Sequence, residues 1–174
     1  MPEEAITTLR AELDRFERAE EGFALLEVFL EVARPQLGAV LLDPVGLRLP
    51  EGMTDDRALV QELLEEIERE PRGSGRVVER AFDMDDEQAR WDYVRLAYSS
   101  NQATVWSARH RTTYFEAAGP HKATYWLPDS LKAEYFGALT ARGWAVPQDW
   151  LEAVAKRPKP WWKRGGRQAV SPPS

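Results

Sequence analysis

The stretch that decides the fold is TYWLPDSLKAEYFGALTARGWAVPQDWLEAV, residues 124–154. It predicts a short extended segment followed by a helix whose apolar residues recur every four positions. Gly143 suits the position just after the helix end, where a left-handed residue closes the last turn. We expect Trp144 to pack back on Leu139 and Pro147 to open a second short helix. The stretch therefore predicts a strand, a helix, a tight stop and another helix.

Upstream of this stretch, the second half of the chain is rich in β-forming residues separated by polar turns. Alternation is clearest over residues 91–98, WDYVRLAY, which we expect to form a strand. One apolar run in the first half also predicts a strand. These segments predict an α+β fold, in which an antiparallel sheet of about five strands is covered by helices on one side. The expected strands are 39–42, 76–82, 91–98, 103–108, 112–117 and 122–127.

Further helices are predicted in the acidic first half of the chain. Residues 2–19 carry one apolar stripe, at spacings of three and four, on an otherwise charged segment. Gly22 is expected to break the chain, and Pro35 to end the helix that follows. At the last long helix of the chain, Asp129 or Ser130 is the expected N-cap. The expected helices of the first half are 2–19, 23–34 and 57–70, and the stripe of the first comprises Ile6, Leu9, Leu13 and Phe16.

Length and composition indicate one folded domain. The chain has 174 residues, of which 43% are hydrophobic, enough for a core without covalent staples. We place the domain at residues 1–155, with a helical segment over 1–35. The chain has no cysteine, which excludes disulfides and thiolate metal sites and fits a reducing cytoplasm. Neither a signal peptide nor an apolar run of roughly 18 residues is found, so the expected location is the cytoplasm, with no membrane contact.

Charge is strongly segregated along the chain. Residues 1–90 hold 23 acidic and 11 basic residues, whereas residues 156–174 hold six basic residues and no acidic one. Since phosphate contacts need a basic face, the acidic front argues against nucleic-acid binding by the body of the protein. The tail, 156–174, is predicted to be disordered. The tail contains the pair Trp161-Trp162 beside Lys163 and Arg164. Three interpretations of this pair remain open: docking on the domain or on a dimer partner, binding another protein, or binding single-stranded nucleic acid.

No catalytic or metal-binding signature is present. The two histidines, His110 and His121, have no neighbouring ligand pattern, and the motifs of zinc proteases, serine hydrolases and nucleotide-binding loops are absent. Residues 83–87 resemble the start of a calcium loop, but Gln88 and Val94 stand where that loop needs glycine and glutamate. We therefore expect a solvated acidic turn between two strands, no cofactor, no metal and no enzymatic activity.

Part of the chain resembles a known family. Over roughly residues 91–151 it is similar to YbjN-type proteins and the related TY-Chap domains. The resemblance implies a fold like that of type III secretion chaperones, usually homodimeric, which binds segments of other proteins without catalysis. Arg95 departs from the family's usual glutamine, and 109–120 looks like an insertion. The residues that carry the resemblance are Tyr93-Val94-Arg95, Tyr125-Trp126-Leu127-Pro128, Leu131 to Leu139, Gly143-Trp144-Ala145-Val146-Pro147 and Trp150.

The sequence thus favours a chaperone-like, homodimeric adaptor that holds a partner protein segment by groove docking or strand addition. Two alternatives remain: an immunity or antitoxin protein whose acidic front caps a basic toxin, and an accessory protein that binds nucleic acid through its tail. The residues predicted to contact a partner are Tyr93, Arg95, Trp106, Trp161, Trp162, Lys163 and Arg164.

Overall fold

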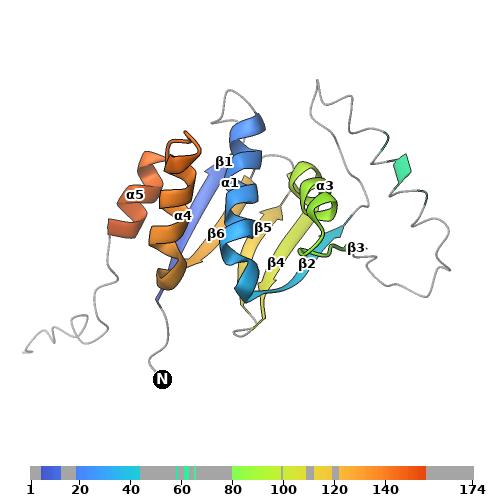
Figure 1. Cartoon of the computed structure of the whole chain (residues 1–174), viewed down its shortest axis with the longest axis horizontal. Helices are drawn as coiled ribbons and strands as arrows, with labels where there is room; N and C mark the ends of the chain where they lie inside the picture. The colour runs from blue at the N-terminus through green and yellow to red at the C-terminus, as the bar shows by residue number, and fades with distance from the viewer. Residues whose placement is uncertain are drawn as a thin grey trace, which may run out of the picture.

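The computed structural model describes six main segments of the chain and a few isolated positions: residues 5–12, 19–43, 58, 61–62, 65, 80–98, 100–108, 112–118 and 122–155. Its elements are, in chain order, β1 (Ile6–Glu12), α1 (Ala19–Ala33), the 3-10 turn η2 (Arg34–Gln36), β2 (Leu37–Asp43), β3 (Arg80–Ala81), α3 (Glu87–Ala97), β4 (Gln102–Ser107), β5 (Thr113–Ala118), β6 (Lys122–Pro128), α4 (Asp129–Ala141) and α5 (Gln148–Ala155) (Figure 1).

The strands form one sheet in the order β1-β6-β5-β4-β2-β3, and every neighbouring pair is antiparallel. The predicted α+β class and antiparallel sheet are confirmed. Strands β2, β4, β5 and β6 lie within two residues of their predicted bounds. Of the strand predicted over 76–82, the structure describes residues 80–82, and Arg80–Ala81 pair in the sheet as β3. In Figure 1 the helices lie on the viewer's side of the sheet, in the order α5, α4, α1, α3 across it.

The helix predicted over residues 2–19 is wrong, because residues 6–12 form β1. All seven residues of β1 pair with β6, from Ile6 opposite Pro128 to Glu12 opposite Lys122. Leu9 and Ala11 are buried while their neighbours along the strand are exposed or half-buried, which is the alternation of a strand with one face on the core. Pairing with a distant strand has therefore overridden a spacing that also fits a helix.

The strand predicted over residues 91–98 is also wrong, because Glu87–Ala97 is helix α3. The Asp86 side chain accepts a hydrogen bond from the backbone N–H of Gln88 at 3.0 Å, which is an N-cap interaction. Asp86 also ends the acidic turn, which therefore connects a strand to a helix rather than two strands. The buried residues of α3 are Tyr93, Val94, Leu96 and Ala97. They are spaced three and four positions apart, as on one face of a helix, although the apolar residues of this segment also fit the alternation of a strand.

Two smaller predictions about helix ends are wrong. Helix α1 continues through Gly22, which therefore does not break the chain. The N-cap of α4 is Pro128, with extended backbone and no side-chain hydrogen bond, instead of Asp129 or Ser130. Asp129 is the first helical residue, where its charge favours the positive end of the helix dipole.

The predicted stop after α4 is confirmed. Gly143 has a φ of +80°, and its N–H donates to the carbonyl of Thr140 at 3.0 Å. The N–H of Trp144 donates to the carbonyl of Leu139, also at 3.0 Å. These two bonds are the pair that defines a Schellman motif, and half-buried Trp144 packs against the core. Pro147 then accepts a hydrogen bond from the N–H of Trp150 at the start of α5.

Aromatic rings form the centre of the core between helices and sheet. Phe29 of α1 contacts Tyr114, Tyr125 and Tyr135 edge-on, with ring centroids 5.3–6.4 Å apart. Trp150 of α5 lies 5.2 Å from the ring of Tyr125, so one cluster joins α1, α4 and α5 to β5 and β6. Such edge-to-face pairs add about 0.5–1.5 kcal/mol each beyond their buried area.

Helix α5 also reaches the outer edge of the sheet. The indole N–H of Trp150 donates to the backbone carbonyl of Arg10 in β1 at 2.7 Å. The carbonyl of Ala5 accepts from the N–H of Asp129, next to β6. Since backbone groups alternate in direction along a strand, the carbonyl of Arg10 faces away from β6. Trp150 therefore occupies part of the free edge of β1.

Several predicted features lie outside the described residues: His110, His121 and the tail 156–174. Of the helix predicted over 57–70, residues 58, 61, 62 and 65 are described, and they are helical and exposed. Among the described residues, no helix is both long and apolar enough to cross a membrane.

Candidate partner-binding groove

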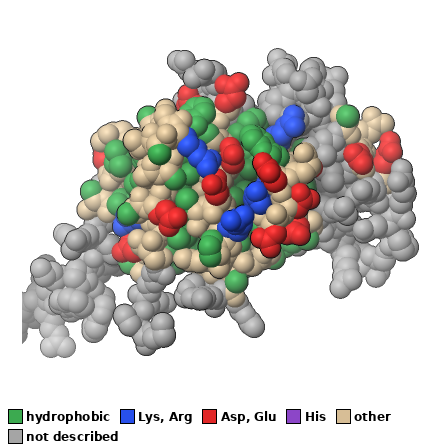
Figure 2. Space-filling view, in the orientation of Figure 1, with side chains coloured by type: hydrophobic (Ala, Val, Ile, Leu, Met, Phe, Trp, Pro, Cys, Tyr) green, Lys and Arg blue, Asp and Glu red, His purple; other side chains and the backbone are tan. Residues whose placement is uncertain are grey.

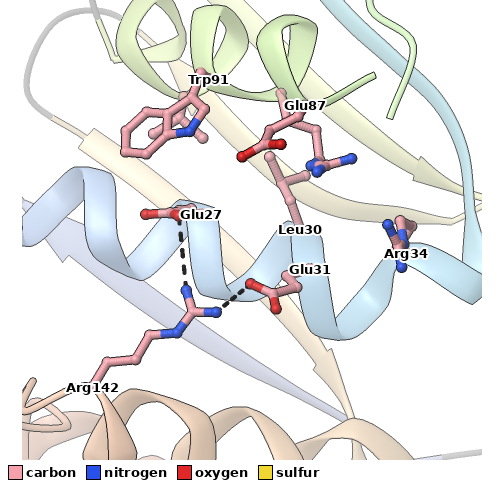
Figure 3. A pocket seen from close by; sticks show the side chains of 9 residues that line it. Glu27, Leu30, Glu31, Arg34, Glu87, Trp91 and Arg142 are labelled. Atoms are coloured by element: carbon pink, nitrogen blue, oxygen red, sulfur yellow. Dashed lines mark hydrogen bonds and ion pairs between the residues drawn. The ribbon is translucent and has the colours of Figure 1, made fainter. Parts of the chain in front are cut away.

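A groove of about 360 Å³ runs between α1 and α3 and reaches Arg142, just after α4 (Figure 3). Helix α3 lines it with four residues at positions i, i+3, i+4 and i+7, and α1 together with the first residue of η2 lines it at the same spacings, which is one face of a helix. Its lining residues are Glu27, Leu30 and Glu31 from α1, Arg34 from η2, Glu87, Arg90, Trp91 and Val94 from α3, and Arg142. We call this site the α1–α3 groove.

The floor of the groove is apolar and one wall carries an exposed indole. Leu30 and Val94 are fully buried parts of the core. Trp91, in contrast, is 44% exposed, and Figure 3 shows its ring extending from α3 towards Glu27 on α1. A large apolar side chain is thus held at the surface directly above the core.

Both signs of charge surround this floor. Figure 2 shows acidic and basic side chains gathered together over α1 and α3. Arg142 places one guanidinium nitrogen 3.8 Å from Glu27 Oε1 and donates a hydrogen bond with the other to Glu31 Oε2. All three side chains are more than a third exposed, so solvent screens these ion pairs and each is worth at most about 1 kcal/mol. Their structural effect is to fasten the end of α4 to α1.

The other end of the groove has charges without such a partner. Arg34 and Glu87 form no ion pair with any of the described residues. Arg90 donates a hydrogen bond to the backbone carbonyl of Met84, which holds it against the turn that precedes α3. In Figure 3, Glu27 and Trp91 lie towards one end of the groove and Arg34 lies at the opposite end. A bound segment would therefore meet different charges along its length.

The described residues that line the groove offer apolar, carboxylate and guanidinium groups. No histidine, serine, threonine or cysteine is among these lining residues. In the described part of the chain, no group of three or more metal-ligating side chains lies close enough to hold an ion. These groups suit apolar contact and charge pairing with a partner.

Four tyrosines have strongly shifted acidities but lie in the core. Burial away from water is the main cause that raises the pKa of Tyr93, Tyr98, Tyr125 and Tyr135 above the ordinary tyrosine value. All four are at most 1% exposed. They cannot reach a substrate in the folded protein, so their shifts reflect packing.

The structure does not bring together the three predicted partner-binding residues that it describes. Tyr93 is fully buried on the core side of helix α3, so it cannot contact a partner. Arg95 is half-buried on the same helix. Trp106 in β4 is 38% exposed, and its neighbours Val105 and Ser107 are buried, so it points away from the core. The remaining four, Trp161, Trp162, Lys163 and Arg164, lie outside the described residues.

The groove residues were missed by sequence reasoning, although part of the signal was present. Recognising Asp86 as an N-cap would have placed Glu87, Trp91 and Val94 on one helical face. Arg142 carries no local signal, because its partner Glu31 lies 111 residues away along the chain.

Comparison with known proteins found no matching family model, no matching curated protein and no matching solved structure. The resemblance to YbjN-type proteins and TY-Chap domains therefore stays a prediction.

Proposed function

We propose that this chain is a non-enzymatic, chaperone-like adaptor that holds a segment of a partner protein in the α1–α3 groove. The observation that carries the proposal is Trp91, whose 44% exposed indole stands above the buried floor of Leu30 and Val94. Tryptophan and arginine dominate the energetics of protein interfaces. An apolar surface rimmed by polar groups is typical of interaction sites.

The charges of the groove suggest how a segment would be oriented. An apolar side chain of the partner would cover Trp91 and the floor. A basic group would lie towards Glu27, and an acidic group towards Arg34 at the opposite end. Charged rims of this kind contribute more to orientation and specificity than to affinity.

Two further parts of the proposal come from the sequence: that the protein is a homodimer, which the resemblance implies, and that it works in the cytoplasm, which fits the lack of cysteine. Sedimentation equilibrium of the purified chain tests the first directly. A single species at the mass of one 19.9 kDa chain, over the whole working concentration range, would reject the dimer.

Neither alternative gains a specific observation from the groove. Its three acidic and three basic residues balance, so it has no net preference for a basic toxin. The residues proposed for nucleic-acid binding lie in the tail, outside the described part of the chain. Both alternatives remain predictions.

The test compares two exposed tryptophans in one assay. Tagged wild type, Trp91→Ala and Trp106→Ala are used to capture partners from the native cell, and the captured proteins are quantified by mass spectrometry. We expect one partner to be retained by wild type and Trp106→Ala and lost by Trp91→Ala. With that partner purified, Trp91→Ala should raise its Kd by a factor of about 30, as a hot-spot residue does.

Unfolding curves of both variants guard against a trivial loss of structure. Each tryptophan is less than half exposed, so both variants should lose some stability but keep a cooperative transition. Equal capture by Trp91→Ala and wild type would reject the groove as the binding site.

A further inference from the structure

A second hollow lies between α4 and α5, on the other side of α4 from the α1–α3 groove. It is an open, almost wholly apolar depression of about 680 Å³, and we call it the α4–α5 hollow. Leu151 on its α5 side is 43% exposed, which makes it one of four large apolar side chains so exposed in the described part of the chain. Its lining residues are Phe136, Gly137, Thr140, Ala141, Val146 and Leu151.

Gly137 keeps this hollow open on the α4 side. It is exposed in the middle of the helix, and a β-carbon added there would meet no atom within 4 Å. Glycine inside a helix costs roughly 0.5–1 kcal/mol relative to alanine. The glycine therefore weakens the helix while leaving space over Phe136 and Leu151 that a bulky group can fill.

We propose that Trp161 and Trp162 of the chain's own tail fill the α4–α5 hollow. Helix α5, which forms one wall, ends at Ala155, so the tail begins beside the hollow. Leu151 lies four residues before that end, which is about 6 Å of helix. Trp161 follows Ala155 by six residues, which span up to about 20 Å when extended. The tail can therefore turn back past α5 and place its indoles over Leu151.

The composition of the tail fits this occupant. Its two tryptophans are adjacent and are its only aromatic residues, so they are the one element of the tail able to bury a large apolar area. The basic residues that surround them, Lys159 and Lys163 among them, would remain at the rim in water. Lys156 and Arg157 directly follow α5, where positive charge favours the negative end of the helix dipole.

Hydrogen–deuterium exchange of the full-length protein tests the proposal. The double substitution Trp161→Ala with Trp162→Ala is compared with Lys163→Ala and Arg164→Ala, which removes two neighbouring cations and keeps the indoles. We expect the tryptophan variant to speed exchange of the α5 amides about tenfold, since covered helices open less often. The cation variant should leave that exchange unchanged.

A second pair of variants tests the hollow itself. Gly137→Leu should fill the hollow from α4 and displace the indoles, so that acrylamide quenches the tryptophan fluorescence more strongly than in Gly137→Ala. The alanine variant strengthens the helix without filling the hollow.

Three results would overturn the proposal: unchanged α5 exchange in the tryptophan variant, equal quenching of the two Gly137 variants, or α5 protection that falls on dilution. The last would assign the hollow to the tail of a second copy. None of these results depends on Trp91, so they leave the proposed partner groove untouched.

Discussion

At the scale of single residues, the buried tyrosine hydroxyls are not equivalent. The hydroxyls of Tyr98 and Tyr125 form a hydrogen bond of 2.6 Å, and Tyr135 donates to the backbone carbonyl of Leu25. The hydroxyl of Tyr93 is buried and has no hydrogen-bond partner among the residues that the structure describes. Burying an unpaired hydroxyl costs about 1–3 kcal/mol, whereas removing one member of a buried pair leaves the other unsatisfied.

Opposite signs are therefore expected for two phenylalanine substitutions. Tyr93→Phe should leave the free energy of unfolding unchanged or raise it by up to about 1 kcal/mol, whereas Tyr98→Phe should lower it by about 1–3 kcal/mol. Urea unfolding followed by circular dichroism measures both under the same conditions. A clear loss of stability in Tyr93→Phe would show that its hydroxyl has a partner.

The same residues predict a loss of stability at high pH. Burial raises the pKa of Tyr93, Tyr98, Tyr125 and Tyr135 above the unfolded value of about 10. Above that value the unfolded chain loses protons that the folded protein keeps, so the stabilisation is fully present below pH ~10 and decreases above it. Each residue contributes a slope of up to about 1.4 kcal/mol per pH unit. Unfolding free energies measured in urea from pH 8 to pH 11 test this, and a flat profile would contradict it.

At the scale of elements, two glycines have opposite effects on α4, one inside the helix and one just after its end. Gly143 ends the helix at φ +80°, where a β-carbon costs about 1–2 kcal/mol. Gly137 lies within the helix with open space around it. Gly143→Ala should therefore destabilise the protein by about 1 kcal/mol, whereas Gly137→Ala should stabilise it by roughly 0.5–1 kcal/mol.

Thermal unfolding of wild type, Gly137→Ala and Gly143→Ala compares the stability effects at the two sites. The two variants are matched because both replace glycine by alanine and both act on α4. Shifts of the melting temperature in the same direction would contradict the assignment of Gly143 as the left-handed stop.

The success of sequence reasoning also varied from element to element. The end of α4 was predictable because Gly143 and Trp144 act through bonds within a few residues. Strand β1 was not predictable from its own residues, because its short segment fits both the helical and the strand spacing of apolar residues. Only the pairing with β6 decides between helix and strand. For α3, the signal that decided the structure was the cap at Asp86, and not the alternation that follows it.

At the scale of the whole molecule, the candidate site depends on the assembly of three helices. Most of the sheet could be inferred from local composition. The α1–α3 groove could not, since it needs α1, α3 and Arg142 to be placed side by side on that sheet. The sequence shows that residue 91 is aromatic, but the exposure of Trp91 depends on which face of α3 packs against the core.

The contact between Trp150 and Arg10 has a consequence for synthesis of the chain. The two residues lie 140 positions apart, and β1, at the edge of the sheet, pairs only with β6 among the described strands. Strand β1 leaves the ribosome before β6 and α5, so it must wait for both before it can pair and be covered. Such long-range closure slows folding. Until β6 has been synthesised, β1 is a strand without its sheet partner.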